Sequence, residues 1–475
     1  MVVAVRVVAD DDLREERTVH EILTIDTSTL GDRSYLAHDG TVALVVDPQR
    51  DIDRILDLAA RHRVRIAHVF ETHIHNDYVS GGLALAQVTG AEYHVNTEDE
   101  VAFDRHPIGD GDVVEVSPHL RVRALATPGH TFTHLSYALH VDGEPVAVFT
   151  GGSLLFGSTG RPDLLGPEHT GTLVRHQHAS ARRLADELPD QTAVLPTHGF
   201  GSFCSATETS GDASTIGHEK RSNPALRLAE DDYVEMLLAG LDAYPAYYAH
   251  MGVINSAGAP PVDLSLPEMA DPAKLRRRID AGEWVVDLRT RSAFAAGHMV
   301  GTLNFGIDGS MATYLGWLIP WGTPVTLLGD TAAEVAEAQR ELVRIGIDRP
   351  AAAATGGPSA WAAGEELGRF RRAGFSELAD AAADDDLVIL DVRRRSEWEA
   401  SHIDGAVHVP LHELLQQLPD LPDGEVWVHC AAGYRATVAA SILARAGRQV
   451  VAVDDDYANA AGAGLPLSVT SEVPA

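Results

Sequence analysis

The sequence predicts a multidomain protein that combines α/β and α+β architecture, and three observations predict it. A chain of 475 residues is long enough for about three domains. In the N-terminal part, short strand-like apolar runs stand beside a helical segment. In the C-terminal part, one stretch occurs twice, beginning at positions 286 and 390, and each copy alternates strands with helices. Such alternation indicates a parallel sheet with helices on both faces.

The composition is acidic and excludes several classes of partner. Because 69 acidic residues outnumber 37 basic ones, the net charge is −32, and nucleic acid and anionic membranes are poor partners. A hydrophobic content of 45% fits a soluble globular protein. Two cysteines cannot build a disulfide framework, and no segment resembles a signal peptide or a membrane-spanning helix. We therefore expect a cytoplasmic protein.

The first predicted elements lead up to a polar turn. Their apolar residues are grouped as in strands and in one amphipathic helix. The predicted strands are residues 21–24, 42–46 and 66–70, and the predicted helix is 52–61. The turn that follows the third strand contains two histidines and an aspartate. The end of this strand is therefore the first place to look for a functional site.

Four histidines and one aspartate in these turns are candidate metal ligands. His73 and His75 stand at i and i+2 just past a predicted strand end, so both can point toward one cation. Asp77 adds a carboxylate two residues later. His130 and His198 stand in turns after later predicted strands. One His-x-His motif is weak by itself, since it is more often a surface or capping feature than a ligand pair, but the ordered set of motifs is a strong indication of the fold.

The same motifs, in the same order, resemble the metallo-β-lactamase superfamily. They are His-x-His-x-Asp at 73–77, Pro-Gly-His-Thr at 128–131 and Thr-His-Gly at 197–199. The resemblance implies an αββα fold for residues 1–255, in which two mixed sheets lie between helices. It also implies that the metal lies at the edge of the sheets.

Three further segments resemble the persulfide dioxygenase branch of that superfamily, which is near glyoxalase II. The segments are Gly160-Arg161-Pro162-Asp163-Leu164, Gly201-Ser202-Phe203-Cys204 and the stretch from Thr215 to Pro224. The resemblance implies one Fe(II) per chain, with O₂ and a low-molecular-weight thiol persulfide as substrates. It assigns the metal to the first histidine of the motif, the Pro-Gly-His histidine and an aspartate. These correspond to His73, His130 and Gly152.

Two positions depart from the pattern of the family. Gly152 cannot ligate, and Tyr78 stands where a binuclear hydrolase has histidine, which argues against two-zinc hydrolysis. Three accounts of the site remain open: iron on two histidines with water or a carboxylate such as Asp77, a site completed by His75 or His198, or a metal-free shell that binds thiols. We expect metal binding because the other candidate ligands persist, with Fe(II) preferred and Zn as the alternative.

Cys204 follows the Thr-His-Gly turn and can approach the metal region. As a buried small residue it would only pack, which is at least as common for a free cysteine. If its thiol is accessible, it is a candidate acceptor of sulfane sulfur or a redox sensor.

The C-terminal repeat predicts two similar domains, residues 262–365 and 370–475. The stretch 286–292 aligns with 390–396, and both copies contain Asp-x-Arg followed by a histidine. In the second copy these are Asp391, Arg393 and His402, and because they recur we expect them to hold the scaffold. Both copies resemble rhodanese domains. The first copy has Gly329-Asp330 where the second has His429-Cys430, so we expect the first copy to be structural.

The second copy contains the loop Cys430-Ala431-Ala432-Gly433-Tyr434-Arg435 between a predicted strand and a predicted helix. A thiol at such a turn faces unpaired backbone N–H groups at the positive end of the helix dipole. These groups stabilise an anionic adduct on sulfur, and Arg435 adds a positive charge. The six-residue loop resembles that of rhodanese-type sulfurtransferases. The resemblance implies that Cys430 carries a persulfide and exchanges sulfur with sulfite or thiosulfate.

Together these patterns predict a fusion enzyme of sulfide metabolism. Its N-terminal domain would oxidise a persulfide to sulfite, and Cys430 would transfer sulfur. One alternative is a zinc-dependent, glyoxalase II-like thioester hydrolase. Another is a metal-free, thiol-binding platform attached to an active sulfurtransferase. Glutathione, coenzyme A and other small thiols all fit as the carrier, and superfamily relatives that dimerise make a homo-oligomer an expectation.

Overall fold

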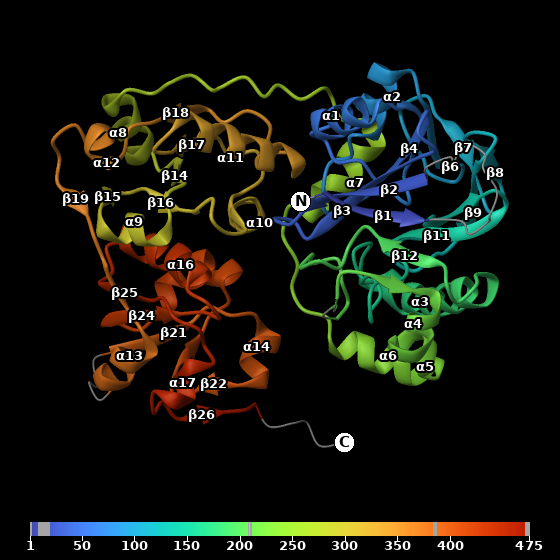
Figure 1. The fold of residues 1–475 in the computed structure, drawn as a ribbon. Coiled ribbons are helices and arrows are strands. Elements are labelled where there is room, and N and C mark those ends of the chain that lie inside the picture. Colours follow the sequence, from blue (N-terminus) through green and yellow to red (C-terminus); the bar gives the residue numbers. More distant parts are fainter. Residues whose placement is uncertain (1, 8–19, 208, 210, 383–386, 471–475) are drawn as a thin grey trace. The chain divides into compact units, whose positions relative to one another are not determined.

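The structure is a computed structural model, and it describes residues 2–7, 20–207, 209, 211–382 and 387–470 (Figure 1). The chain divides into two compact units. The first consists of residues 1–262 and 343–346, and the second of residues 263–342 and 347–475. The predicted division into three domains stays a prediction. Among the described residues, no helix is both long and apolar enough to cross a membrane.

The first unit contains a seven-stranded sheet with the strand order β1-β2-β3-β4-β5-β6-β7. Its strands are β1 (Val2–Val7), β2 (His20–Thr27), β3 (Asp32–His38), β4 (Val42–Val46), β5 (Arg65–Phe70), β6 (Glu92–Asn96) and β7 (His106–Ile108). Neighbours from β1 to β4 pair antiparallel, and those from β4 to β7 pair parallel. The strands predicted from apolar runs coincide with β2, β4 and β5.

A second, six-stranded sheet has the order β13-β12-β11-β10-β9-β8. Its strands are β8 (Val113–Glu115), β9 (Leu120–Ala126), β10 (Leu135–Val141), β11 (Glu144–Gly151), β12 (Ala193–Pro196) and β13 (Ser214–Thr215). Only β11 and β12 pair parallel, and the other neighbours are antiparallel. Both sheets of this unit are therefore mixed, as predicted.

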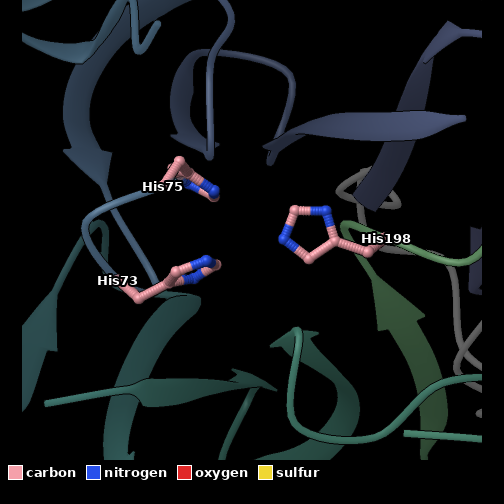
Figure 2. A group of neighbouring side chains, drawn as sticks. All are labelled: His73, His75 and His198. Carbon is pink, nitrogen blue, oxygen red and sulfur yellow. The ribbon is translucent and has the colours of Figure 1, made fainter. Parts of the chain in front are cut away.

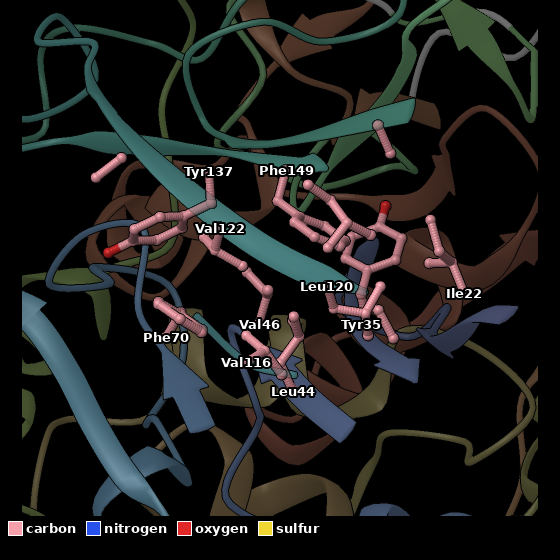
Figure 3. Packing of buried hydrophobic residues seen from close by; sticks show 14 of the residues in the cluster. Ile22, Tyr35, Leu44, Val46, Phe70, Val116, Leu120, Val122, Tyr137 and Phe149 are labelled. Atoms are coloured by element: carbon pink, nitrogen blue, oxygen red, sulfur yellow. The ribbon is translucent and has the colours of Figure 1, made fainter. Parts of the chain in front are cut away.

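The main core of the first unit lies between the two sheets (Figure 3). Alternate side chains of each sheet point into it, and large rings meet across the gap: Tyr35 and Phe149 lie 5.4 Å apart between centroids, and Phe70 and Tyr137 lie 5.0 Å apart. Burial of such apolar surface is the main force that holds two sheets face to face.

Helices cover the outer faces of both sheets. A second apolar cluster joins the first sheet to α1 (Asp53–His62) and α2 (Gly82–Thr89), and α7 (Tyr248–Ala257) lies near them (Figure 1). A third cluster joins the second sheet to α3 (Pro167–Glu187), α4 (Ile216–Ser222), α5 (Pro224–Arg227) and α6 (Glu230–Ala239). The unit is thus the αββα sandwich predicted from the histidine motifs.

The second unit contains two parallel sheets, and the second repeats the strand order of the first with one strand added at the edge. The first is β16-β14-β17-β18, with β14 (Trp284–Asp287), β16 (Leu303–Asn304), β17 (Val325–Leu328) and β18 (Ala352–Ala354). The second is β23-β21-β24-β25-β20, with β20 (Arg371–Ala373), β21 (Leu387–Asp391), β23 (Val407–His408), β24 (Glu425–His429) and β25 (Val450–Val453).

Helices and two small sheets complete both copies. The first copy has α8 (Pro272–Asp280), α9 (Arg291–Ala296), α10 (Met311–Leu318), α11 (Ala332–Arg344) and α12 (Pro358–Ala362). The second has α13 (Phe375–Ala381), α14 (Arg395–Ala400), α15 (Leu414–Gln417), α16 (Tyr434–Arg445) and α17 (Asn459–Gly462). The small sheets pair β15 (His298–Met299) with β19 (Leu367–Gly368), and β22 (His402–Ile403) with β26 (Leu467–Ser468).

The repeated residues make the same contacts in both copies. Arg289 pairs with Asp287, and Arg393 pairs with Asp391, in each case with 2.6 Å between Nη2 and Oδ2. The repeated histidine donates from Nδ1, at 2.9 Å, to the carbonyl of the residue four positions earlier. Its ring stacks on that same residue at 3.9 Å between centroids. These contacts lie inside each copy, as expected for residues that hold the scaffold.

The strand register corrects one alignment made from the sequence. Asp287 pairs with Leu328 in the first copy, and Asp391 pairs with His429 in the second. The residue that corresponds to Cys430 is therefore Gly329, and not Asp330 as the motif alignment placed it. A strand register counts residues through hydrogen-bonded neighbours, so it detects a one-residue offset that sequence similarity between short motifs misses.

Candidate functional site

Four histidines from three loops come together at one edge of the two sheets of the first unit. His73 and His75 lie on the turn after β5, His130 lies after β9, and His198 lies after β12. The rings of His73, His75 and His198 point toward a common centre (Figure 2), with centroids 4.1, 5.4 and 5.7 Å apart. The ring of His130 is 4.8 Å from that of His73. All four are buried.

One nitrogen of each ring is buried and has no hydrogen-bond partner among the described residues. These atoms are Nε2 of His73, His130 and His198, and Nδ1 of His75. Leaving one such group unpaired costs about 1–3 kcal/mol, so four together in one place require an explanation. Suitable ligand atoms of His73, His75 and His198 also lie within 4.8 Å of one another. The donor set therefore fits a transition-metal ion.

The opposite ring nitrogens are held by the protein, which orients the free ones. Nδ1 of His130 lies 2.8 Å from the carbonyl oxygen of Arg161, which can only accept, so the proton is on Nδ1. Nδ1 of His73 lies 2.9 Å from Oγ1 of Thr72, and Nδ1 of His198 lies 3.0 Å from a carboxylate oxygen of Asp32. Such partners fix the ring and direct the Nε2 lone pair toward a metal.

His75 is oriented through its Nε2 atom, whereas the other three histidines are oriented through Nδ1. Its Nε2 lies 3.0 Å from the hydroxyl of Tyr78, 3.2 Å from Glu71 and 3.3 Å from Asp47, so its Nδ1 faces the other histidines. Burial alone lowers the pKa of His75, but Asp47 and Glu71 raise it to a net value of about 9, so a metal ion must displace the Nδ1 proton to bind there. Tyr78 thus supports a ligand candidate rather than replacing one. The amide of Asn255 in α7 steadies the same turn by donating to the carbonyls of His75 and Tyr78, at 2.8 and 2.9 Å.

Asp77 and Cys204 also border the cluster. Oδ2 of Asp77 lies 3.0 Å from Nδ1 of His198, and Oδ1 lies 4.0 Å from Nδ1 of His75. Cys204 forms a group with His130 and His198 whose ligand atoms lie within 4.8 Å of one another. Its thiol is fully buried, and burial raises its pKa. The structure therefore places Cys204 at the cluster, and its role stays a proposal.

The packing of His130 explains why residue 152 is glycine. A Cβ atom built on Gly152 would overlap the His130 ring, with Cγ only 2.6 Å away. A carboxylate at position 152 and this position of His130 are therefore mutually exclusive. Of the three accounts left open by the sequence, the observed geometry favours a cluster completed by His75 and His198, with Asp77 in reach.

Several residues of the site were not found from the sequence. Asp32, Asp47, Glu71 and Thr72 support the histidines but carry no motif of their own. His134 is also near, with its ring 5.0 Å from that of His73. Its Nε2 accepts a hydrogen bond from the backbone of Gly152 at 3.1 Å, and its Nδ1 lies 2.9 Å from Oγ1 of Thr127, so both nitrogens are already engaged.

The Cys430 loop of the second unit lies between β24 and α16. Cys430 is 2% exposed, and the backbone N–H of Gly433 donates to its Sγ at 3.2 Å. Gly433 has φ +87°, and a Cβ there would overlap the carboxylate of Asp454. The carbonyl of Ala431 accepts a hydrogen bond from the backbone of Tyr457 at 2.8 Å. The loop is therefore held tightly around the sulfur atom, while Ala432 is exposed.

Arg435 and Tyr434 have roles that the sequence did not indicate. Arg435 forms a bidentate pair with Glu397 of α14, at 2.6 and 2.7 Å, so its charge is already neutralised. Burial alone raises the pKa of Glu397, but the hydrogen bonds and charge of Arg435 lower it to about 2. The hydroxyl of Tyr434 donates to the carbonyl of Gly306 at 3.0 Å, so it attaches the loop to the first copy.

A narrow pocket lies beside Arg435. Its free volume is only about 10 Å³, which is about the least that can hold one water molecule. The lining residues come from both copies of the repeat: Tyr314, Trp317 and Leu318 from the first, and Val392, Arg394, Pro410, Leu411, His412 and Arg435 from the second. Trp317 stacks on His412 at 4.9 Å between centroids. The first copy thus contributes a wall to the surroundings of the loop.

Comparison with known proteins agrees with both halves of this description. Residues 375–462 match the rhodanese-like domain family. A hydroxyacylglutathione hydrolase from Pseudomonas putida strain GB-1 is 30% identical over 210 residues, which cover 39% of this chain and 77% of that protein. Another, from Polaromonas sp. strain JS666, is 31% identical over 160 residues, 33% of this chain. Here the chain spans only 57% of the relative's length.

A solved structure resembles a larger part of the chain. It is a metallo-β-lactamase from Staphylococcus aureus subsp. aureus COL, with a TM-score of 0.63 and 26% identity. The match covers 72% of this chain and 99% of that chain. The chain therefore combines a metallo-β-lactamase-like fold with a C-terminal rhodanese-like domain.

Proposed function

The chain belongs, through its N-terminal region, to the family of the hydroxyacylglutathione hydrolases, and from this premise we propose that it is an enzyme of sulfur metabolism. Its first unit would oxidise the persulfide of a small thiol to sulfite, with Fe(II) as cofactor. Its rhodanese-like domain would transfer sulfur through Cys430. Small sulfur species would link the two activities, since sulfite is a product of the first and an acceptor in the second.

The observation that carries the proposal is one histidine cluster in which Tyr78 stands in place of a histidine of two-metal hydrolases. The hydroxyl of Tyr78 forms a hydrogen bond with Nε2 of His75. No side chain fits at position 152, because a Cβ atom there would overlap the ring of His130. The family pattern gives two-metal hydrolases a histidine at position 78, and it gives the single iron an aspartate at position 152, whose place the other histidines would take. A single ion on histidines, with positions left open, suits the binding of O₂ and a sulfur ligand.

His73, His75 and His198, whose ligand atoms lie within 4.8 Å of one another, would hold the ion, with His130 and Asp77 beside it. When bound, Fe(II) would supply a centre at which O₂ and the persulfide sulfur can react. The overall reaction balances as RSSH + O₂ + H₂O → RSH + SO₃²⁻ + 2 H⁺. Thr72, Arg161 and Asp32 keep the imidazoles oriented, and the burial of the cluster limits access of water.

At the other site, the Cys430 thiolate would attack the outer sulfur of thiosulfate. The S–S bond of thiosulfate breaks as a new one forms on Sγ, and sulfite leaves: Cys–S⁻ + S₂O₃²⁻ → Cys–S–S⁻ + SO₃²⁻. The reverse step passes the outer sulfur to sulfite. The N–H of Gly433 would stabilise the anionic sulfur, as it already donates to Sγ.

The experiment measures both activities on the full chain. With Fe(II) and glutathione persulfide we expect O₂ uptake and sulfite, both lost in His73→Ala, while sulfur transfer from thiosulfate to cyanide is retained. Cys430→Ser should show the opposite pattern. His176→Ala is the matched control, because it removes an exposed histidine outside the cluster. Absence of O₂ uptake in protein with one Fe(II) bound would contradict the proposed oxidation of persulfide by the first unit.

A second candidate function is thioester hydrolysis, which the relationship to the hydroxyacylglutathione hydrolases favours. It predicts turnover of S-lactoylglutathione by zinc-loaded protein, without consumption of O₂. Assay of one preparation with both substrates separates the candidates. If hydrolysis alone is found, the oxidation is wrong and the role of Cys430 still stands.

A further inference from the structure

Three histidines and a glutamate gather on the first sheet, away from the candidate metal centre. His68 lies on β5, Glu92 and His94 lie on β6, and His106 lies on β7. The strand register pairs His68 with Glu92 and His94 with His106. Because Glu92 and His94 are two residues apart, all four side chains share one face of the sheet. The parallel pairing of three strands therefore builds this group.

The donor atoms of the group have the spacing of metal ligands. Nδ1 of His68 lies 3.1 Å from Nε2 of His94, and Oε2 of Glu92 lies 3.5 and 3.6 Å from these two nitrogens. Zinc bonds of about 2.0–2.2 Å in a tetrahedron place ligand atoms about 3.3–3.6 Å apart. Nδ1 of His106 lies 3.8 Å from the same oxygen of Glu92 and is available as a fourth ligand.

The surroundings suit entry and retention of an ion. His68 and His94 are almost buried, and their rings stack on Phe70, with centroids 6.2 and 4.4 Å from it, so their positions are fixed by the core. The side chains of Glu92 and His106 are 48% and 57% exposed, so the group opens to solvent on that side. Burial, together with His68 and His106, lowers the pKa of His94 to about 3, and a neutral imidazole is the form that ligates.

We propose that His68, Glu92, His94 and His106 form a second, structural site for a divalent transition-metal ion such as Zn²⁺. The ion joins β5, β6 and β7, and so fastens the three-residue strand β7 at the edge of the sheet. This inference does not depend on the proposed function. The site lies before the carboxyl end of β5, whereas the candidate metal centre lies beyond it.

The test is a titration of the metal-stripped full chain with Zn²⁺, and with Co²⁺ for its visible absorption in tetrahedral sites. We expect the double variant Glu92→Gln/His106→Ala to bind one ion fewer per chain than the wild type, or to bind it at least tenfold more weakly. Both substituted side chains are largely exposed, so the fold should survive, and thermal unfolding without metal checks this.

A matched control removes another exposed pair of the same kind. His119 and Asp142 lie 2.7 Å apart, and His119→Ala/Asp142→Asn should bind as many ions as the wild type. Zn²⁺ should also raise the melting temperature of the wild type more than that of the Glu92→Gln/His106→Ala variant. If the wild type and this variant bind the same number of ions with equal affinity, the group is only a histidine–histidine hydrogen bond and the proposal is overturned. Oxygen uptake with glutathione persulfide should be equal in both proteins.

Discussion

The two copies of the C-terminal repeat share a scaffold and differ at one turn. In the first copy β17 ends at Leu328 and α11 begins at Ala332, and in the second β24 ends at His429 and α16 begins at Tyr434. The turn of the first copy is thus one residue shorter. There the backbone N–H of Asp330 donates to the carboxylate of Glu334 at 2.8 Å, whereas in the second copy the N–H of Gly433 donates to sulfur.

This difference shows how a reactive turn is made on a common fold. A helix start always presents unpaired N–H groups, which need an acceptor. The first copy supplies its own carboxylate, which accepts from the N–H of Asp330. The second copy supplies a thiol and a glycine with φ +87° that lets the chain close around it. The Asp-Arg pair is the same in both copies, so it is compatible with a turn that contains a thiol and with one that does not.

The largest expected effect is the loss of the thiol. Cys430→Ser should reduce sulfur transfer from thiosulfate to cyanide by on the order of 10³-fold or more, because the nucleophile is lost. Adding Gly329→Cys to this variant places a thiol at the corresponding position of the first copy. We expect no recovery, because Glu334 engages that turn. Recovery of sulfur transfer would show that the shared scaffold with a thiol at this position is sufficient for activity.

The next effect concerns the glycine of the active turn. Gly433→Ala should lower kcat/KM for sulfur transfer about 10–100-fold, because the left-handed conformation is strained and the new Cβ meets Asp454. Gly447→Ala is the control, since Gly447 has φ +80° with no atom near its Cβ position. It should cost only about 1 kcal/mol of stability and leave kcat/KM unchanged. Equal effects on kcat/KM would assign the loss to backbone strain alone.

A third prediction uses the ion pair that only the second copy has. Glu397 has a pKa of about 2 in the fold, below its ordinary 4.5, so the pair stabilises the fold fully above about pH 4.5 and less as the pH falls toward 2. Glu397→Gln should therefore lower the free energy of unfolding by about 2–3 kcal/mol at pH 7. Denaturant titrations at pH 7 and pH 3 test this, and a difference independent of pH would contradict it.

The smallest expected effect concerns the residues of the first copy that line the pocket beside Arg435. Trp317→Leu should widen the pocket beside Arg435, whose lining residue Tyr314 is close enough to Cys430 to interact with its charge, and so increase the rate at which iodoacetamide alkylates Cys430 by about threefold. Trp321→Leu removes an exposed indole nearby in the chain and should not change the rate. Equal rates in both variants would mean that the first copy does not limit access to Cys430.

The sequence predicted those parts of the sites that lie within short segments. The His-x-His turn follows an apolar strand, and the Cys430 loop stands between a strand and a helix, so local pattern was sufficient for both. The pairing of Glu397 with Arg435 could not be predicted in this way, because the residues next to each of them in the sequence carry no information about the other. The same limit hid Asp32 behind His198, and it produced the one-residue error at Gly329.

The sequence by itself determined which reactive groups the chain has and in which turns they stand, because turns, strands and helices depend on neighbouring residues. Only the tertiary structure decided which groups meet. It brought His198 to His73 across two sheets, put the ring of His130 where a side chain at position 152 would stand, and neutralised Arg435 with Glu397. The physical reason is that contacts between distant segments depend on how sheets and helices pack, and packing is a property of the whole fold.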